Sequence, residues 1–97
     1  MATVVYSAHS LAQIESVLRS QRTEAPEAAL HTCAAIRSAV ESVAAHPLLG
    51  SRTREGLREL VISYGPSGYV ALYRYLARHD EVRMLSLRPQ RDVGLVP

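Results

Sequence analysis

The sequence predicts an α+β fold in which a two-helix hairpin packs on an antiparallel β-sheet of three or four strands. In the first half of the chain, apolar residues recur at the three- and four-residue spacing of helices. In the second half, segments rich in Tyr, Val and Leu alternate with turn residues, as in a meander of strands. Helices that precede a run of antiparallel strands are typical of the α+β class. With 97 residues, we expect one domain over residues 1–97.

The first half of the chain predicts one strand and two helices. Residues 2–6 are mostly β-branched or aromatic, which favours a strand. Helical spacing then extends from Ser10 to about residue 20, and Ser10 with Gln13 three residues later resembles a capping box. A longer helix is expected over residues 26–45, because proline suits the first turn of a helix and the next proline, at position 47, ends it.

The second half predicts a loop over residues 48–55 and then three strands. These strands are expected over residues 57–64, 69–77 and 82–87. The Gly-Pro-Ser-Gly run at 65–68 and the polar residues 78–81 are typical of turns. Short turns between consecutive strands make the pairing antiparallel.

Arginine supplies all of the positive charge. The chain has 11 arginines, no lysine and a net charge of +2. The absence of lysine excludes a P-loop, a Schiff base and a lysine general base. A net charge this small does not by itself indicate nucleic-acid binding, but eight of the 11 arginines lie from Arg52 onward, in the predicted sheet half.

Neither a metal nor a cofactor is expected. The four histidines fall in different predicted elements, without the i, i+4 spacing of helical metal ligands. Cys33 is the single cysteine and lies on the apolar stripe of the longer helix, where we expect a buried, inert thiol. No apolar run approaches the length of a membrane helix, so we expect a cytoplasmic protein without a membrane partner.

Tyrosines and arginines of the predicted sheet are the candidate binding residues. Tyr69, Tyr73 and Tyr75 share one face of a strand, where they either stack on bases or, as we favour, fill the core. The arginines of the strands either form a cationic band for phosphates or carboxylates or lie on a solvated face. The predicted binding residues are Arg58, Tyr73, Arg74, Arg88 and Arg91, with Arg83 a further member of the band.

Three segments together resemble the RelE/ParE family of bacterial type II toxins. They are His-Pro-Leu-Leu-Gly at 46–50, Gly-Leu-Arg-Glu-Leu at 56–60 and Gly-Tyr-Val-Ala-Leu-Tyr-Arg at 68–74. The resemblance implies the toxin fold of this family and a cognate antitoxin that forms a hetero-oligomer with the toxin. It also implies one of two targets: ribosome-bound mRNA, cut by RelE-like members, or DNA gyrase, inhibited by ParE-like members.

Departures from the RelE pattern favour the second target. The resemblance places Val70 where RelE-like nucleases have an arginine that supports the scissile phosphate, and Leu95 where relatives have a tyrosine. If the chain is a nuclease, Arg58 and Arg91 are the catalytic candidates, with Tyr64 or Tyr73 as a displaced tyrosine. We therefore favour ParE-like inhibition of a protein such as gyrase, with ribosome-dependent mRNA cleavage as the alternative.

Two expectations concern surfaces. An acidic antitoxin segment is expected to pair its carboxylates with Arg58 or Arg74. The C-terminal stretch 88–97 is expected to carry the activity, because it concentrates Arg88, Arg91 and Asp92 beyond the last predicted strand.

Overall fold

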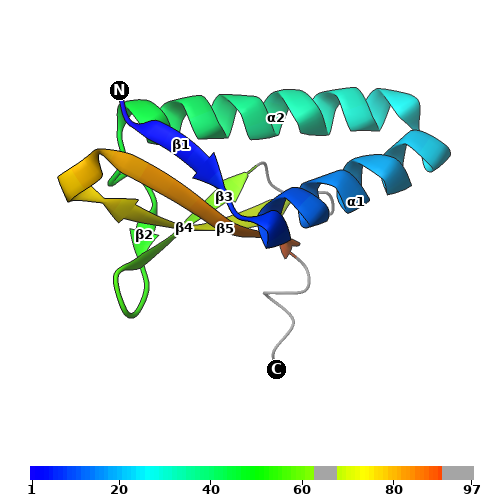
Figure 1. Ribbon diagram of the computed structural model, residues 1–97. Helices are drawn as coiled ribbons and strands as arrows, with labels where there is room; N and C mark the ends of the chain where they lie inside the picture. The colour runs from blue at the N-terminus through cyan, green and yellow to red at the C-terminus, as the bar shows by residue number, and fades with distance from the viewer. Residues whose placement is uncertain (63–67, 91–97) are drawn as a thin grey trace.

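Two helices lie on one face of a five-stranded sheet in the computed structural model, which describes residues 1–62 and 68–90 (Figure 1). The α+β class and the two-helix hairpin are confirmed. The sheet order is β1-β5-β4-β3-β2. In chain order the elements are β1 (Thr3–Tyr6), α1 (Ala8–Glu24), α2 (Pro26–Ala45), β2 (Ser51–Arg52), β3 (Leu57–Ile62), β4 (Tyr69–Leu76), the short 3₁₀ helix η1 (Ala77–His79) and β5 (Glu81–Pro89).

The sheet has one more strand than the upper bound of the prediction, and one of its pairs is parallel. The extra strand is β2, two residues of the expected loop, which pair with Glu59 and Arg58 of β3. The first strand, β1, runs parallel to β5 because the helical hairpin returns the chain to its starting side before the meander begins. The central pairs β3–β4 and β4–β5 are antiparallel, as predicted.

Helix α1 begins earlier and ends later than predicted. Its cap is Ser7, whose side chain accepts the Ser10 N–H at 3.0 Å, whereas Ser10 itself is buried inside the first turn. The capping box of Ser10 and Gln13 is therefore wrong. The helix continues to Glu24 because no breaker precedes the single extended residue Ala25, which the following proline disfavours in α conformation.

Polar side chains of α1 and of its cap residue bond the part of β5 that β1 does not reach. The β1 pairing ends at Met84. Beyond it, the Ser7 hydroxyl donates to the Leu85 carbonyl at 3.2 Å, and the Gln13 Oε1 accepts the Leu87 N–H at 2.7 Å. An uncovered strand edge is prone to pairing with other chains, so these bonds protect the edge as well as fixing α1 on the sheet.

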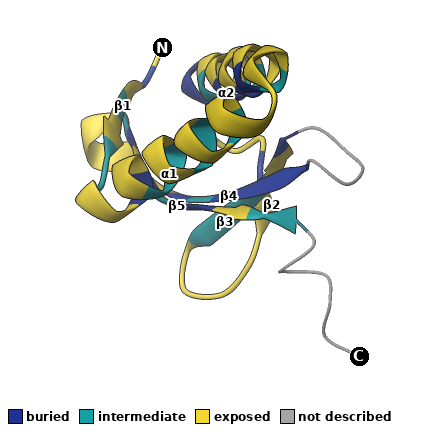
Figure 2. Ribbon diagram, turned by 90° about the vertical axis from the view of Figure 1, so that its right-hand side faces the viewer, coloured by how far each residue is buried: buried dark blue, intermediate teal, exposed yellow. Residues whose placement is uncertain are grey.

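The core lies between the helices and the sheet, and strand β4 is its most buried element (Figure 2). Alternate residues of β4, namely Tyr69, Ala71 and Tyr73, face the helices. Core filling by these tyrosines, the favoured alternative, is thus confirmed. The other buried residues of the core cluster are Ala2, Ile36, Val43, Ile62, Val82, Met84 and Leu87.

The Tyr73 hydroxyl holds the loop between α2 and β2. Tyr73 is fully buried, and its hydroxyl donates to the Pro47 carbonyl and accepts the Gly50 N–H, both at 2.8 Å. Nη1 of Arg58, the cross-strand neighbour of Tyr73, donates to the Gly50 carbonyl at 2.8 Å and to the Leu48 carbonyl at 3.2 Å. Four backbone groups of the loop are therefore satisfied by two side chains of the sheet.

Gly50 is needed at this contact because a side chain does not fit there. A Cβ on Gly50 would lie 2.7 Å from Cε1 of Tyr73 and 2.8 Å from the carbonyl oxygen of Glu59. The tyrosine ring and the backbone of β3 are both fixed by packing, so neither has room to move away.

No helix of the described residues is long and apolar enough to cross a lipid bilayer.

The substitution Tyr73→Phe is expected to lower the free energy of unfolding by about 1–3 kcal/mol, because it leaves the Pro47 carbonyl and the Gly50 N–H without their partner. Tyr75→Phe is the matched control, since the Tyr75 hydroxyl bonds Asp80 at an exposed position. We expect it to destabilise the fold clearly less than Tyr73→Phe does, because the exposed Asp80 carboxylate can bond water instead. Equilibrium urea denaturation measures both, and equal losses would contradict the anchoring role.

The substitution Gly50→Ala is expected to destabilise the fold by about 1–3 kcal/mol through overpacking. Combined with Tyr73→Phe it should cost less than the sum of the two, because the hydroxyl that crowds the new methyl group is gone. A double-mutant cycle by urea denaturation measures this coupling. Strict additivity would show that the Tyr73 hydroxyl does not limit the residue at position 50.

Candidate functional site

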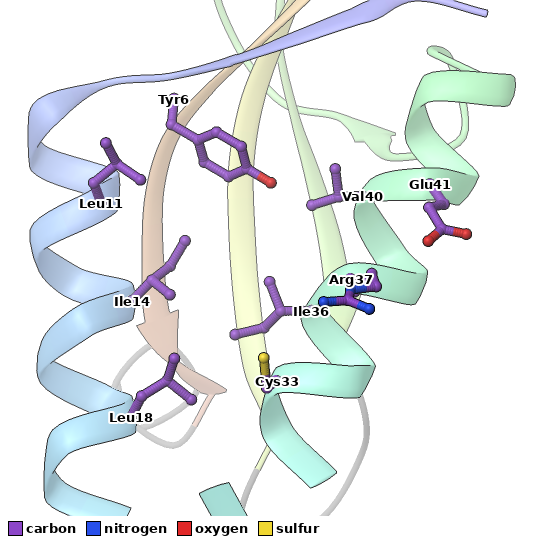
Figure 3. Close-up of a pocket in the computed structure, with 9 residues that line it drawn as sticks. All are labelled: Tyr6, Leu11, Ile14, Leu18, Cys33, Ile36, Arg37, Val40 and Glu41. Atoms are coloured by element: carbon purple, nitrogen blue, oxygen red, sulfur yellow. The ribbon is translucent and has the colours of Figure 1, made fainter. Parts of the chain in front are cut away.

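The two helices enclose an apolar groove of about 280 Å³ (Figure 3). Leu11, Ile14 and Leu18 point into it from α1, opposite Ile36 and Val40 of α2. Leu11 is 51% exposed, although it is a large apolar residue. The groove therefore presents accessible apolar surface of the kind that marks interaction sites.

Tyr6 and Cys33 add two polar atoms to the groove. Burial raises the pKa of the Tyr6 phenol, so this hydroxyl stays protonated at neutral pH and remains a hydrogen-bond donor. Cys33 is exposed and lines the groove, so the expectation of a buried thiol is wrong. The apolar stripe of α2 therefore contributes some residues to the core and others, such as Cys33, to this groove.

A few charged side chains lie along the rim of the groove. Arg37 and Glu41 contribute one charge of each sign from α2. Charge at this rim is therefore mixed, and the groove itself selects chiefly for apolar side chains.

The second candidate surface is the face of the sheet that α1 and α2 do not cover, here called the open face. Because Tyr69, Ala71 and Tyr73 face the helices, Val70, Leu72 and Arg74 of β4 lie on the open face. Cross-strand pairing adds Val61 from β3 and Arg83 and Arg88 from β5. Val61 is 39% exposed. Three arginines thus share this face with Val61, Val70 and Leu72, and Glu59 lies opposite Leu72.

Arg74 and Arg83 lie directly opposite each other on the β4–β5 pair. Arg83 forms a 2.6 Å ion pair with Glu81. Arg74 donates to the Glu55 backbone carbonyl at 3.2 Å, and no carboxylate of the described residues pairs with it. Arg88 lies at the other end of the face, opposite Val70. Of the residues of the predicted cationic band, Arg74, Arg83 and Arg88 therefore lie on the open face.

Arg58 is not part of that band. Its cross-strand partner is Tyr73, so it projects toward the helix-covered side, and its guanidinium is bound to the loop carbonyls. Tyr73, a predicted binding residue, is 0% exposed. The structure gives both residues a role in anchoring the loop, which a sequence pattern cannot distinguish from ligand binding because the loop partner is remote in the chain.

The C-terminal prediction is only partly accessible to the structure. Arg91 and the rest of 91–97 lie outside the described residues, as does Tyr64. Arg88 and Pro89 belong to β5, so the last strand extends two residues beyond the predicted end at Leu87. Gln90 continues the contact, since its N–H donates to the Gly68 carbonyl at 2.8 Å.

The open face offers little acid–base chemistry. Among its described residues the carboxylates are Glu59 and Glu81, and Glu81 is held by Arg83. Arginine stays protonated and is neither a general acid nor a general base in proteins. Tyr75 is on the other face, and its hydrogen bond to Asp80 raises the pKa of its phenol, which disfavours a reactive phenolate. The arrangement is suited to binding charged and apolar groups.

Sequence reasoning missed the groove and the exposed part of the open face. The available signal was an excess of apolar residues on α1: Leu11, Ile14, Val17 and Leu18 cover a wider arc than one sheet contact requires. Val61 lies in the strand predicted over residues 57–64, where alternation does not tell a solvated face from a covered one.

Solved structures of toxin–antitoxin systems share the fold. The chain aligns with the chromosomal ParDE system from P. aeruginosa at a TM-score of 0.73 and 18% identity, over 92% of this chain and 96% of that chain. It aligns with the intact E. coli RelBE toxin–antitoxin complex at a TM-score of 0.62 and 14% identity, over the same shares of each chain.

Two sequence comparisons go further. Toxin RelE3 of Caulobacter vibrioides is 44% identical over 50 residues, and the aligned part is 52% of this chain and 54% of that toxin, so the chain spans about half the length of this relative. The family model described as the ParE toxin of the type II toxin–antitoxin system parDE matches residues 4–94. With nearly its whole length matched, the chain belongs to the ParE toxin family of type II toxin–antitoxin systems.

Proposed function

We propose that this toxin acts by binding and inhibiting a protein target such as DNA gyrase, without cutting RNA, and that a cognate antitoxin neutralises it. The observation that carries the proposal is the composition of the open face, where arginines share the surface with apolar residues and general acids and bases are scarce. Such a surface supplies binding energy through apolar burial and charge pairing.

RNA cleavage needs more than this face provides. An attack by the ribose 2′-hydroxyl requires a base, a proton donor for the leaving group and positive charge for the phosphorane. Arg88 satisfies the last requirement, and the neighbouring Val70 is apolar and 7% exposed. Ribosome-dependent mRNA cleavage remains the alternative, supported by the 44% identity to a protein named Toxin RelE3.

The apolar groove supports the antitoxin part of the proposal. Both solved relatives are toxin–antitoxin systems. A groove between two helices with exposed apolar walls suits the apolar stripe of an amphipathic helix, whose side chains recur at i, i+3, i+4 and i+7. We place the antitoxin contact in this groove rather than at Arg58, which is occupied by the loop.

Induction of the toxin without its antitoxin is expected to arrest growth and to trigger the DNA damage response, with no new mRNA 5′ ends inside codons. The reason is that a gyrase inhibitor damages DNA, whereas a ribosome-dependent nuclease leaves codon-phased cuts. Transcript-end sequencing and a DNA-damage reporter are measured in the same culture. Codon-phased cuts without DNA damage would overturn the proposal in favour of the nuclease.

The substitution Leu11→Asp is expected to weaken antitoxin binding about tenfold or more, because it places a carboxylate in the apolar groove. Leu11 is exposed enough that the fold should tolerate the change. Leu30→Asp is the matched control, since Leu30 is 73% exposed and is not among the groove residues.

Isothermal titration of the purified toxin with the antitoxin encoded beside it measures both variants, with growth arrest as the second readout. We expect Leu30→Asp to bind as the unchanged toxin does, and both variants to remain toxic. Equal affinities of the two variants for the antitoxin would contradict the proposal that the antitoxin binds in the groove.

A further inference from the structure

We infer that the open face binds an acidic segment of the protein target, with carboxylates at both ends of the segment and apolar side chains between them. The inference rests on the proposed function and adds to it the chemistry of the contact. The Arg74–Arg83 pair is assigned to one end of the segment and Arg88 to the other. Leu72 is assigned to its middle, and Val61 to the same end as Arg88.

The Arg74–Arg83 pair indicates an anionic partner. Like charges directly opposite each other on antiparallel strands destabilise the pairing. Glu81 neutralises Arg83 with a bond to its Nε, which leaves the remaining donors of that guanidinium for another acceptor. Arg74 has a single backbone carbonyl as partner among the described residues. A carboxylate placed between the two guanidinium groups would accept from both and remove their repulsion.

The spacing of the arginines sets the spacing of the carboxylates. Arg88 is opposite Val70, which precedes Arg74 by four residues on the same strand. At about 3.3 Å per residue, the two ends of the face lie roughly 13 Å apart along β4. A partner in extended conformation bridges this distance with acidic residues four positions apart, and a helical partner with acidic residues about nine apart.

The centre of the face favours apolar contact. Leu72 lies between the two cationic ends, opposite Glu59 of β3. Val61, 39% exposed, lies level with Val70 and Arg88 at one end. Burial of Leu72 and Val61 adds about 25 cal/mol for each Å² removed from water, a contribution that salt does not screen. An acidic segment with apolar central residues therefore matches this face better than a uniformly acidic one.

A protein segment fits this face better than RNA does. Recognition of single-stranded RNA relies on aromatic side chains that stack on bases. The described tyrosines of β4, Tyr69, Tyr73 and Tyr75, all lie on the helix-covered side. The open face also lies on the far side of the sheet from the helical layer that holds the groove, so target and antitoxin contact different surfaces (Figure 2).

The test reverses both charges in the double variant Arg74→Glu, Arg83→Glu. Its matched control is Arg19→Glu, Arg22→Glu, which makes the same charge change on exposed positions of α1. We expect at least about ten times more cells to survive induction of the first variant than induction of the unchanged toxin. Its affinity for the antitoxin should stay within about twofold of that of the unchanged toxin. The control variant should remain toxic.

A second variant guards against misfolding. Arg74→Ala, Arg83→Ala removes the repulsive pair without adding negative charge, and should lose toxicity while its thermal unfolding temperature does not fall. Full toxicity of both open-face variants, with no mRNA cuts, would overturn the inference and leave the proposed function standing. Loss of antitoxin binding together with retained toxicity would assign the face to the antitoxin and overturn it as well.

RNA is tested directly with a single-stranded oligouridylate as the probe. We expect no binding that depends on Arg74 and Arg83 in filter-binding assays. Binding that the double reversal abolishes, together with codon-phased cuts in cells, would show an RNA surface and contradict both the inference and the proposed function. The same binding without cuts would contradict the inference alone.

Discussion

The buried hydroxyl of Tyr73 connects the helical layer to the sheet at the point where the chain passes from one to the other. It binds the Pro47 carbonyl and the Gly50 N–H, directly after α2 ends. Unpaired backbone groups in a buried position cost free energy. The loop is therefore most stable in the conformation that lets both groups bond the Tyr73 hydroxyl. The loop in turn fixes where β2 begins and hence the edge of the sheet.

The anchor also determines which sheet residues are free to act. Arg58, like Tyr73, bonds carbonyls of the loop, and its guanidinium therefore lies away from the open face. Arg74, Arg83 and Arg88 remain on the opposite face, where no described helix covers them. Strand alternation therefore places two neighbours in the sequence on different faces: Tyr73 in the core and Arg74 on the open face.

Much of the fold could be predicted because local rules and tertiary packing agree. Pro26 and Pro47 bound the second helix, and the β-branched and aromatic segments form the predicted strands. The misses have a common physical origin. Ser7 rather than Ser10 caps α1, and Arg58 donates to loop carbonyls, because in each case the partner was set by the three-dimensional arrangement and not by spacing in the chain. The parallel β1–β5 pair is the same kind of non-local choice.

The sequence predicted which arginines belong to the candidate surfaces better than it predicted where those surfaces lie. The set of arginines was predicted, although Arg83 and Arg88 are five residues apart and share a face only because the β4–β5 register shifts between Leu72 and Tyr73. The groove was not, because a helix with apolar residues on two sides looks in sequence like a helix with one broad apolar side.

The pairing of β1 with β5 has a consequence for biosynthesis. These strands join the first and last described parts of the chain, and the Ser7–Leu85 hydrogen bond spans 78 residues. At about 5–20 residues per second, a ribosome needs several seconds to make the second strand after the first. Until then α1 and β1 have no sheet to close against. An emerging toxin therefore passes through a stage in which its helical hairpin is complete but its arginine-lined sheet face does not yet exist.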